Sequence, residues 1–466
     1  MSKQGRLLKN TVILFLGTIG TKLINFIMLP LYTDWLSVEE YGVIDVFTTI
    51  VSMAVPILTL QLDQAIFRFM LDDETPQKRT VTVSTALGAL AVVLLVVDVP
   101  VATVLIWQRS WRYLLYLLAV NLQCLYVMCQ QVLRGKGENH IYTVNSILLA
   151  FATMALTILL IRVIPWGVDG YVMAFCAAHL LAIGYMVFQS RIHALIRPAA
   201  FAWDKLRQLL RYSVPMIVNN VSWWILNASD KLVLNIFIGA SANGIFAAAG
   251  KIPGLVTTVY SVFQMAWQES ASREKEGQLD RFYSDVLRKL FAVLSYMVIG
   301  LFLFGRMLCG ILINEKFAEA YNHVPILVLG LLFLCVAQFY GGIYVGKKMS
   351  LELGRTSAIA AVVNLVVDLL CVHFIGVYAA SISTLCAYTV LLVIRFVDVQ
   401  RICRIEYRLR ELVPSAVMLA IAFIGAYLDN IWLQTAIFCG ISVAYFLLYR
   451  DVLGDVLTSL NKKLKK

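Results

Sequence analysis

The chain has 466 residues, of which 60% are hydrophobic and only 14% are charged. Roughly a quarter of the residues of an ordinary soluble domain are charged, so a soluble chain of this length could not hide so much apolar surface. The formal net charge is +11, but the basic residues stand in short groups between apolar stretches. This distribution is typical of membrane topology and argues against a nucleic-acid partner.

Apolar runs alternate with short polar segments along the whole chain, and one membrane span needs about 20 mostly apolar residues. We therefore predict an all-α integral membrane protein with about fourteen transmembrane helices. The first run is too long for the core of a signal peptide and lacks a small-residue cleavage site, so we expect it to be retained. The expected spans are residues 11–34, 41–69, 81–107, 112–133, 141–163, 170–189, 213–239, 245–270, 288–313, 324–346, 357–375, 378–397, 413–428 and 431–449.

The distribution of lysine and arginine predicts the orientation in the membrane. With the N-terminus in the cytoplasm, thirty of the 39 basic residues fall in cytoplasmic segments, including residues 190–212, 271–290 and 395–412. Four lie on the opposite side and five lie inside apolar spans. By the positive-inside rule, this asymmetry over short loops places both termini in the cytoplasm of a multi-pass cell-membrane protein. No linker is long enough to hold a soluble domain.

The two halves of the chain resemble each other in several short motifs. Leu7-Leu8-Lys9 matches Leu209-Leu210-Arg211, and Gly167-Val168 matches Gly376-Val377. Chance similarity between apolar helices is the alternative, but a true repeat gives two pseudo-symmetric six-helix lobes with the same orientation, as in alternating-access transporters. The expected domains are an N-terminal lobe of residues 1–190, a cytoplasmic amphipathic linker of residues 191–212, a C-terminal lobe of residues 213–397, and two further spans with a basic tail in residues 398–466.

Charged residues inside the expected spans need a reason, because a charge near the bilayer centre costs at least about 2.5–3.5 kcal/mol. Lys22 lies near the middle of the first span, and no carboxylate stands within one helical turn of it. Such cations predict a water-filled central cavity whose natural ligand is an anion such as phosphate. Two alternatives stay open. A charged side chain near the end of a span can reach the membrane surface, and Asp230-Lys231 can serve packing alone. The candidate substrate-binding residues are Lys22, Lys231, Lys251, Arg68, Arg306 and Asn227.

Asn364 and Asp368 stand four residues apart, so they share one face of the span 357–375. Hard cations prefer oxygen ligands, so this pair and Asp230 are our candidates for binding a coupling ion, H⁺ or Na⁺. A hydrogen-bonded pair between helices is the alternative interpretation. The nine cysteines show no metal-ligand spacing, and we expect no metal centre and no other cofactor.

Several motifs resemble those of the Wzx-type polysaccharide repeat-unit flippases, which belong to the multidrug/oligosaccharidyl-lipid/polysaccharide exporter superfamily. Each motif is degenerate, and the resemblance rests on their order and spacing over the whole chain except its tail. The matching residues are Leu8-Lys9-Asn10-Thr11, Leu29-Pro30-Leu31-Tyr32, Glu40-Tyr41-Gly42, Arg68-Phe69, Asp230-Lys231, Gly244-Ile245-Phe246, Lys251-Ile252, Phe263-Gln264, Ala266-Trp267-Gln268, Asn364, Gly376-Val377 and Ala379-Ala380.

The resemblance implies a two-lobe transporter that carries undecaprenyl-diphosphate-linked oligosaccharides from the inner to the outer leaflet. It implies a place in the synthesis of lipopolysaccharide, capsule or exopolysaccharide, in a bacterial or archaeal plasma membrane. Association with a polysaccharide polymerase and with glycosyltransferases stays open. The related lipid II flippases, whose last two helices form a groove for the lipid tail, stay open as an alternative, although their paired arginines in the first spans are not matched. A multidrug or metabolite antiporter also stays open. A membrane-embedded glycosyltransferase is disfavoured because no large outward loop carries a catalytic constellation, so we expect no enzyme.

Overall fold

The computed structural model describes residues 20–21, 24, 26–73, 75–273, 279–347, 349–428 and 430–451, and the regular structure within these ranges is helical. Eleven of the helices in this part of the chain are long and apolar enough to cross a membrane. The predicted all-α, multi-pass membrane fold is therefore confirmed, and the total of fourteen spans stays a prediction. Contacts divide the chain into two compact units, Met1–Trp224 and Ile225–Lys466.

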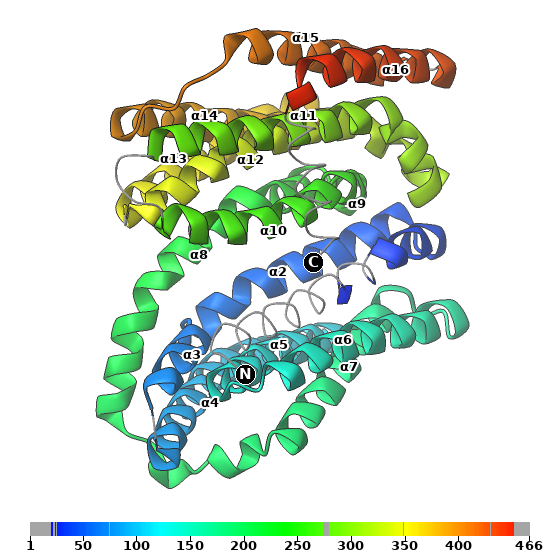
Figure 1. Ribbon diagram of the computed structural model, residues 1–466. Helices are drawn as coiled ribbons and strands as arrows, with labels where there is room; N and C mark the ends of the chain where they lie inside the picture. Colours follow the sequence, from blue (N-terminus) through cyan, green and yellow to red (C-terminus); the bar gives the residue numbers. More distant parts are fainter. Residues whose placement is uncertain are drawn as a thin grey trace. The chain divides into compact units, whose positions relative to one another are not determined.

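In the first unit, the described residues 26–35 are helical and precede α2, and α8 runs on from this unit into the second (Figure 1). The helices of the first unit from α2 onward are α2 (Val38–Leu58), α3 (Leu62–Asp72), α4 (Pro76–Trp107), α5 (Trp111–Lys136), α6 (Asn139–Thr157) with the π-helical turn η1 (Ile158–Val163), α7 (Gly167–Gln189), the short 3-10 helices η2 (Ile192–Leu195) and η3 (Pro198–Ala200), and α8 (Trp203–Phe237). The second unit continues with α9 (Ala240–Ala249), α10 (Lys251–Arg273), α11 (Leu279–Leu312), the 3-10 helix η4 (Glu315–His323), α12 (Val324–Gly346), α13 (Ser350–Ile375), α14 (Tyr378–Ile402), α15 (Leu409–Ala426) and α16 (Ile431–Leu448).

Two expected spans are each formed by two helices. The span 41–69 is broken between α2 and α3, where Leu60 and Gln61 take left-handed backbone conformations with φ of 50° and 54°. The span 245–270 is divided between α9 and α10. Half of the first expected span, 11–34, lies outside the described residues, and its described part 26–34 is helical. Neither the broken backbone nor its position follows from hydropathy, because an apolar run carries no information about backbone dihedral angles.

The residues at the start of helix α2 explain why the helix begins at Val38. Ser37 is its N-cap, and Glu40 stands three residues later, so the two form a capping box. The backbone N–H of Glu40 donates to Ser37 Oγ at 3.1 Å, and the backbone N–H of Ser37 donates to Glu40 Oε2 at 2.9 Å. Two backbone donors that the helix itself cannot pair are thereby satisfied.

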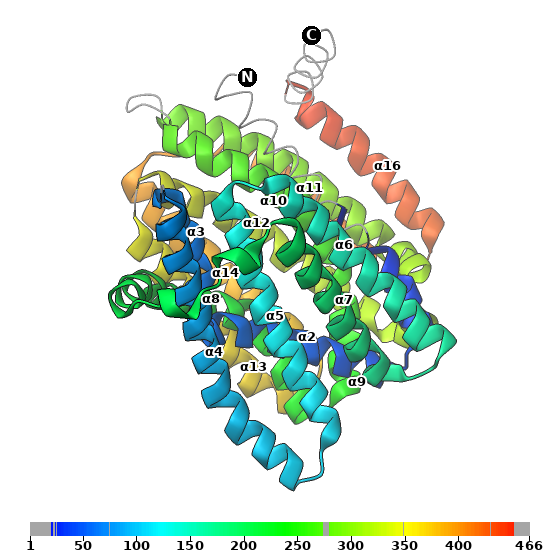
Figure 2. The same ribbon diagram turned by 90° about the horizontal axis from the view of Figure 1, so that it is seen from below.

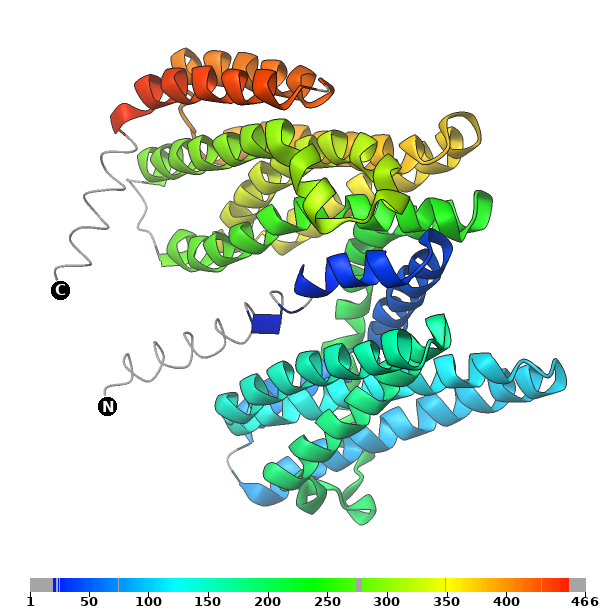
Figure 3. The ribbon, with the colours of Figure 1, turned by 90° about the vertical axis from the view of Figure 1, so that its right-hand side faces the viewer.

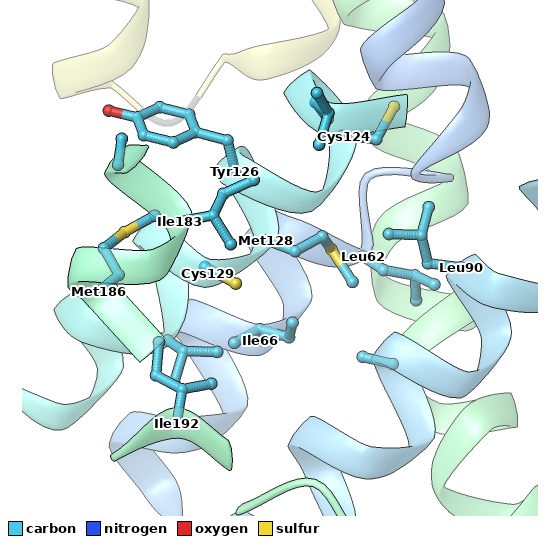
Figure 4. Packing of buried hydrophobic residues seen from close by; sticks show 14 of the residues in the cluster. Leu62, Ile66, Leu90, Cys124, Tyr126, Met128, Cys129, Ile183, Met186 and Ile192 are labelled. Carbon is cyan, nitrogen blue, oxygen red and sulfur yellow. The ribbon is translucent and has the colours of Figure 1, made fainter. Parts of the chain in front are cut away.

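The core of the first unit forms around α5, which packs against α2, α3, α4 and α7. Figure 4 shows Leu62 and Ile66 of α3 near Met128 and Cys129 of α5, and each of the four is at most 1% exposed. Helices α4 and α5 run antiparallel as a long hairpin, visible in Figures 2 and 3. In a bilayer, close van der Waals packing of this kind holds helices together, because lipid tails are as apolar as the side chains.

The second unit is organised around α12, most of which is buried against α10, α11 and α14. Two polar groups from neighbouring helices reach its backbone. The indole N–H of Trp267 on α10 donates to the carbonyl oxygen of Phe339 at 2.9 Å, and the guanidinium of Arg395 on α14 donates to that of Ala337 at 3.0 Å. Gly341 and Gly342 make this approach possible, since a Cβ at Gly341 would lie 2.8 Å from Arg395 Nη1 and one at Gly342 would overlap the Trp267 indole.

We expect Gly342→Ala to destabilise the protein by about 1–3 kcal/mol, the usual effect of overpacking a filled core. The added methyl group would displace Trp267, which also stacks on Phe339 with ring centroids 4.2 Å apart. Thermal unfolding of the purified protein in detergent measures the effect. Gly354→Ala on α13 is the matched control, because a Cβ there meets no atom within 4 Å. Equal stability of the two variants would contradict the packing argument.

Candidate functional site

A buried carboxylate on α8 is the centre of the main polar constellation in the second unit. Asp230 is 3% exposed. Its two carboxyl oxygens accept hydrogen bonds from α14, one from Ser383 Oγ at 3.2 Å and the other from Thr384 Oγ1 at 2.6 Å. The side chains of α14 therefore fix the direction in which the carboxylate points.

Helix α13 supplies the other half of this constellation, through Asn364 and Asp368, both fully buried. Asn364 Oδ1 accepts a hydrogen bond from Ser229 Oγ of α8 at 2.9 Å. The carboxyl group of Asp368 interacts directly with that of Asp230, and neither of its oxygens accepts a hydrogen bond from an N–H or O–H group in the described part of the chain. A hydrogen bond between the two carboxyl groups requires a proton on one of them.

Two adjacent carboxylates without a counter-charge repel each other strongly in a low-dielectric interior. The repulsion between Asp230 and Asp368 is relieved when the pair takes up a positive charge, either as a shared proton or as a metal cation. The oxygen atoms available to such a cation are those of the two carboxyl groups themselves, the hydroxyl groups of Ser383 and Thr384, and the side-chain amide of Asn364. An all-oxygen donor set of this kind suits Na⁺ among the common monovalent cations. The arrangement therefore offers several oxygen ligands to one cation.

The structure brings together the three residues that the sequence singled out for a coupling ion, Asp230, Asn364 and Asp368. It adds three hydroxyl groups that the sequence analysis missed, those of Ser229, Ser383 and Thr384. Their signal is weak, because serine and threonine are common in membrane helices and bond to their own backbone there. Ser383 and Thr384 do follow the Ala379-Ala380 motif closely, after Ser381 and Ile382.

The candidate substrate-binding residues are spread over both units. Lys22 lies outside the described residues, as does the side chain of Asn227 on α8. Arg68 on α3 pairs with Asp72 at 2.7 Å on an exposed surface of the first unit. In the second unit, Lys251 is exposed at the start of α10, Lys231 is half-buried on α8, and Arg306 of α11 stands over the Tyr321 ring with its guanidinium carbon 5.7 Å from the ring centroid.

A smaller polar cluster lies in the first unit at the break between α2 and α3. Gln61, which carries the left-handed backbone, accepts a hydrogen bond from Asn220 Nδ2 of α8 at 2.8 Å. Asp63 is 4% exposed and accepts a hydrogen bond from Gln64 Nε2 at 2.7 Å. These bonds satisfy polar groups at the break and join the first half of α8 to α3.

Comparison with known proteins decides the family. The model of the polysaccharide biosynthesis protein family matches residues 7–268, which is more than half of the chain. The chain belongs to this family. A search of curated protein sequences finds no match.

Solved structures resemble this polysaccharide biosynthesis protein over most of its length. The inward closed conformation of the lipid II flippase MurJ has a TM-score of 0.76 at 13% identity and covers 95% of this chain and 100% of its own. An inward-facing multidrug resistance transporter of the MATE family, in the MOP superfamily, has a TM-score of 0.66 at 14% identity over 86% of this chain and 95% of its own. A MOP superfamily transporter from Pyrococcus furiosus, described by a reversed polarity of its binding pocket, has a TM-score of 0.59 at 13% identity over 84% and 94%.

These identities establish the fold alone, and the fold is that of MOP superfamily transporters. Together with the eleven helices that are long and apolar enough to cross a membrane, the fold indicates a multi-pass membrane protein. The predicted link to polysaccharide synthesis and the predicted transporter-like fold are thereby confirmed.

Proposed function

We propose that the protein is a flippase that moves undecaprenyl-diphosphate-linked oligosaccharide repeat units from the cytoplasmic to the outer leaflet of the cell membrane. The match to the polysaccharide biosynthesis family is the observation that carries the proposal. The likeness in fold to a lipid II flippase supports it, because lipid II is itself a lipid-linked saccharide. Alternating access moves the diphosphate and first sugars through the protein while the polyprenyl chain stays in lipid.

The diphosphate needs cationic partners along its path. We assign this role to Lys22, Lys231, Lys251, Arg68 and Arg306, with Asn227 as a hydrogen-bonding partner of the saccharide. The three lysines suit a diphosphate that must be released again on the other side of the membrane. A lysine acts as a point charge and does not hold a phosphate in the fixed, two-pronged geometry of an arginine.

Coupling to a cation gradient is assigned to Asp230, Asn364 and Asp368. The three residues lie on α8 and α13, and α14 supplies the hydroxyl groups of Ser383 and Thr384. A shift of α8 relative to α13 and α14 would separate the two carboxyl groups and release the cation. Because cation binding favours the arrangement in which the groups are together, it biases the transporter toward one of its states.

The lipid profile of cells deleted for the gene tests the function directly. We expect viable cells that lose a surface glycan and accumulate undecaprenyl-diphosphate-linked repeat units. Lysis with accumulated lipid II would establish the peptidoglycan branch instead, which the fold likeness to MurJ favours. An unchanged pool of lipid-linked sugars with new drug sensitivity would establish an antiporter, which the likeness to the MATE family favours.

The proposed role of the basic residues in binding the diphosphate is tested at Lys251. Its side chain is exposed, so its replacement removes no buried contact. We expect Lys251→Ala to lower flipping of the lipid-linked glycan by about tenfold, the effect of about 1.4 kcal/mol of lost phosphate attraction. Complementation of the deletion strain and the amount of accumulated glycolipid measure the change. Lys78→Ala, at an exposed position in the first turn of α4, is the control. Full complementation by Lys251→Ala would remove this residue from the path.

A further inference from the structure

A groove in the second unit lies apart from the carboxyl pair, between α14 and α15. Helix α11 packs against both α12 and α15, and α12 packs against α14, but α14 and α15 hardly touch each other. The connection of residues 403–408 bridges them over a long stretch without helix (Figure 1). The resulting cavity has a volume of about 880 Å³, within the usual range for small-molecule sites of about 300–1,000 Å³.

The inner wall of this groove is apolar and open to the side. Its apolar lining includes Phe291 of α11, Leu412 of α15, and Leu392, Val393 and Phe396 of α14. Val393 is 53% exposed and Phe396 is 40% exposed, so the wall of α14 faces the surroundings of the protein, which at this level are lipid. The wall therefore offers a hydrocarbon chain a surface on which to pack.

The end of the groove is charged with both signs. Its rim carries the basic residues Arg281, Lys347 and Arg408 and the acidic residues Asp280, Asp285 and Glu406. The rim comes from the first turns of α11, the end of α12 and the connection 403–408, all on the side that the positive-inside rule assigns to the cytoplasm. By this assignment, we expect the rim to lie at the level of the phospholipid headgroups.

Other polar groups at the groove are already paired within the protein. The guanidinium of Arg288 makes two hydrogen bonds to the carboxylate of Glu411, at 2.6 and 2.8 Å, and one to Asp451 at 2.7 Å. The hydroxyl groups of Tyr340 and Tyr407 lie 2.9 Å apart, and burial raises the pKa of Tyr407, so that this hydroxyl stays neutral. These bonds stabilise the inner end of the groove. Arg408 of the rim also lies 3.6 Å from the carboxylate of Glu411, but its side chain is more than half exposed, and the other charged rim residues are exposed as well.

We propose that this groove binds one phospholipid whose headgroup carries both a phosphate and a primary amine, with an acyl chain along Val393 and Phe396. The basic rim residues take the phosphate, and the acidic ones accept hydrogen bonds from the ammonium group. An anionic headgroup without an amine would meet the repulsion of Asp280, Asp285 and Glu406. A choline headgroup carries a positive charge but has no N–H to donate.

Native mass spectrometry of the purified full-length protein, titrated with dioleoyl lipids, tests the proposal. We expect one phosphatidylethanolamine to bind about tenfold more tightly than phosphatidylcholine or phosphatidylglycerol. Val393→Trp should fill the groove and abolish this binding. Val397→Trp, one turn further along the same helix, 41% exposed and outside the lining, is the matched control and should leave it unchanged. Leu412→Trp fills the groove from α15 and should repeat the result if Val393→Trp does not fold.

The headgroup contacts are tested separately from the groove. We expect Asp280→Asn combined with Asp285→Asn to remove the preference for phosphatidylethanolamine over phosphatidylglycerol. Arg408→Gln should weaken all three phospholipids, whereas Arg410→Gln, two residues away and outside the lining, should not. Equal binding of phosphatidylglycerol to the unaltered protein would overturn the assignment of the amine. Displacement of phosphatidylethanolamine by undecaprenyl diphosphate would overturn the proposal, because the groove would then belong to the transported lipid.

Discussion

Replacing Asp368 with asparagine will uncouple transport from the cation gradient and lower the rate of flipping by something of the order of 100-fold. Asparagine keeps the shape of the side chain but removes one of the two negative charges. Because the remaining carboxylate of Asp230 keeps its hydrogen bonds from Ser383 and Thr384, it no longer needs a cation to offset its neighbour. Asp230→Asn should have the same effect, since the repulsion belongs to the pair.

Flipping of the lipid-linked glycan in proteoliposomes, with an imposed Na⁺ or H⁺ gradient, measures this uncoupling. The unaltered protein should respond to one of the two gradients, and that response identifies the ion. Thr384→Val should weaken the response, because Thr384 holds Asp230 at 2.6 Å, whereas Thr389→Val should not. Within the described residues, the Thr389 hydroxyl donates to the backbone carbonyl of Leu385 on its own helix. An unchanged gradient response in the Asp230→Asn, Asp368→Asn double variant would remove the coupling site.

Part of this site is predictable from the sequence for a simple physical reason. Burying a charged or amide group inside a membrane span costs free energy, so Asn364 and Asp368 stand out in the sequence as candidates for a function. Their spacing of four residues puts them on one face of the helix. Their meeting with Asp230, more than 100 residues earlier in the chain, depends on how α8 packs against α13. Periodicity describes each helix alone and carries no information about which helices become neighbours. The partners of Asp230 on α14 were missed for the same reason.

Arg395 shows a second limit. In the sequence it opens the basic segment 395–412, and the count of cytoplasmic charges treats it as a loop residue. In the structure, α14 continues to Ile402, and Arg395 is 1% exposed inside the second unit. The positive-inside argument survives because one residue among thirty changes little. The expected contribution of Arg395 to the stability of the protein does change. An arginine in a loop contributes little, whereas a buried arginine must be fully hydrogen-bonded to be tolerated.

Replacing Arg395 with methionine will therefore destabilise the protein severely. The Arg395 guanidinium forms no salt bridge within the described residues and is held by uncharged groups on two other helices. It donates to the carbonyl oxygen of Ala337 on α12 at 3.0 Å, and on α13 to Thr356 Oγ1 at 3.1 Å and Ser357 Oγ at 2.9 Å. Hydrogen bonds of a charged group contribute about 1.5–3 kcal/mol each, so their joint loss should lower the free energy of unfolding by more than about 3 kcal/mol.

The yield of folded protein in detergent and its thermal unfolding measure this loss, with Arg401→Met as the control at an exposed position of the same helix. Methionine fills part of the space that the arginine stem occupies, so the difference between the two variants reports the lost hydrogen bonds rather than an empty cavity. Arg395→Lys should rescue only part of the stability, because an ammonium group cannot reach α12 and α13 as a planar guanidinium does. Equal stability of Arg395→Met and Arg401→Met would mean that α12, α13 and α14 are held together by apolar packing alone.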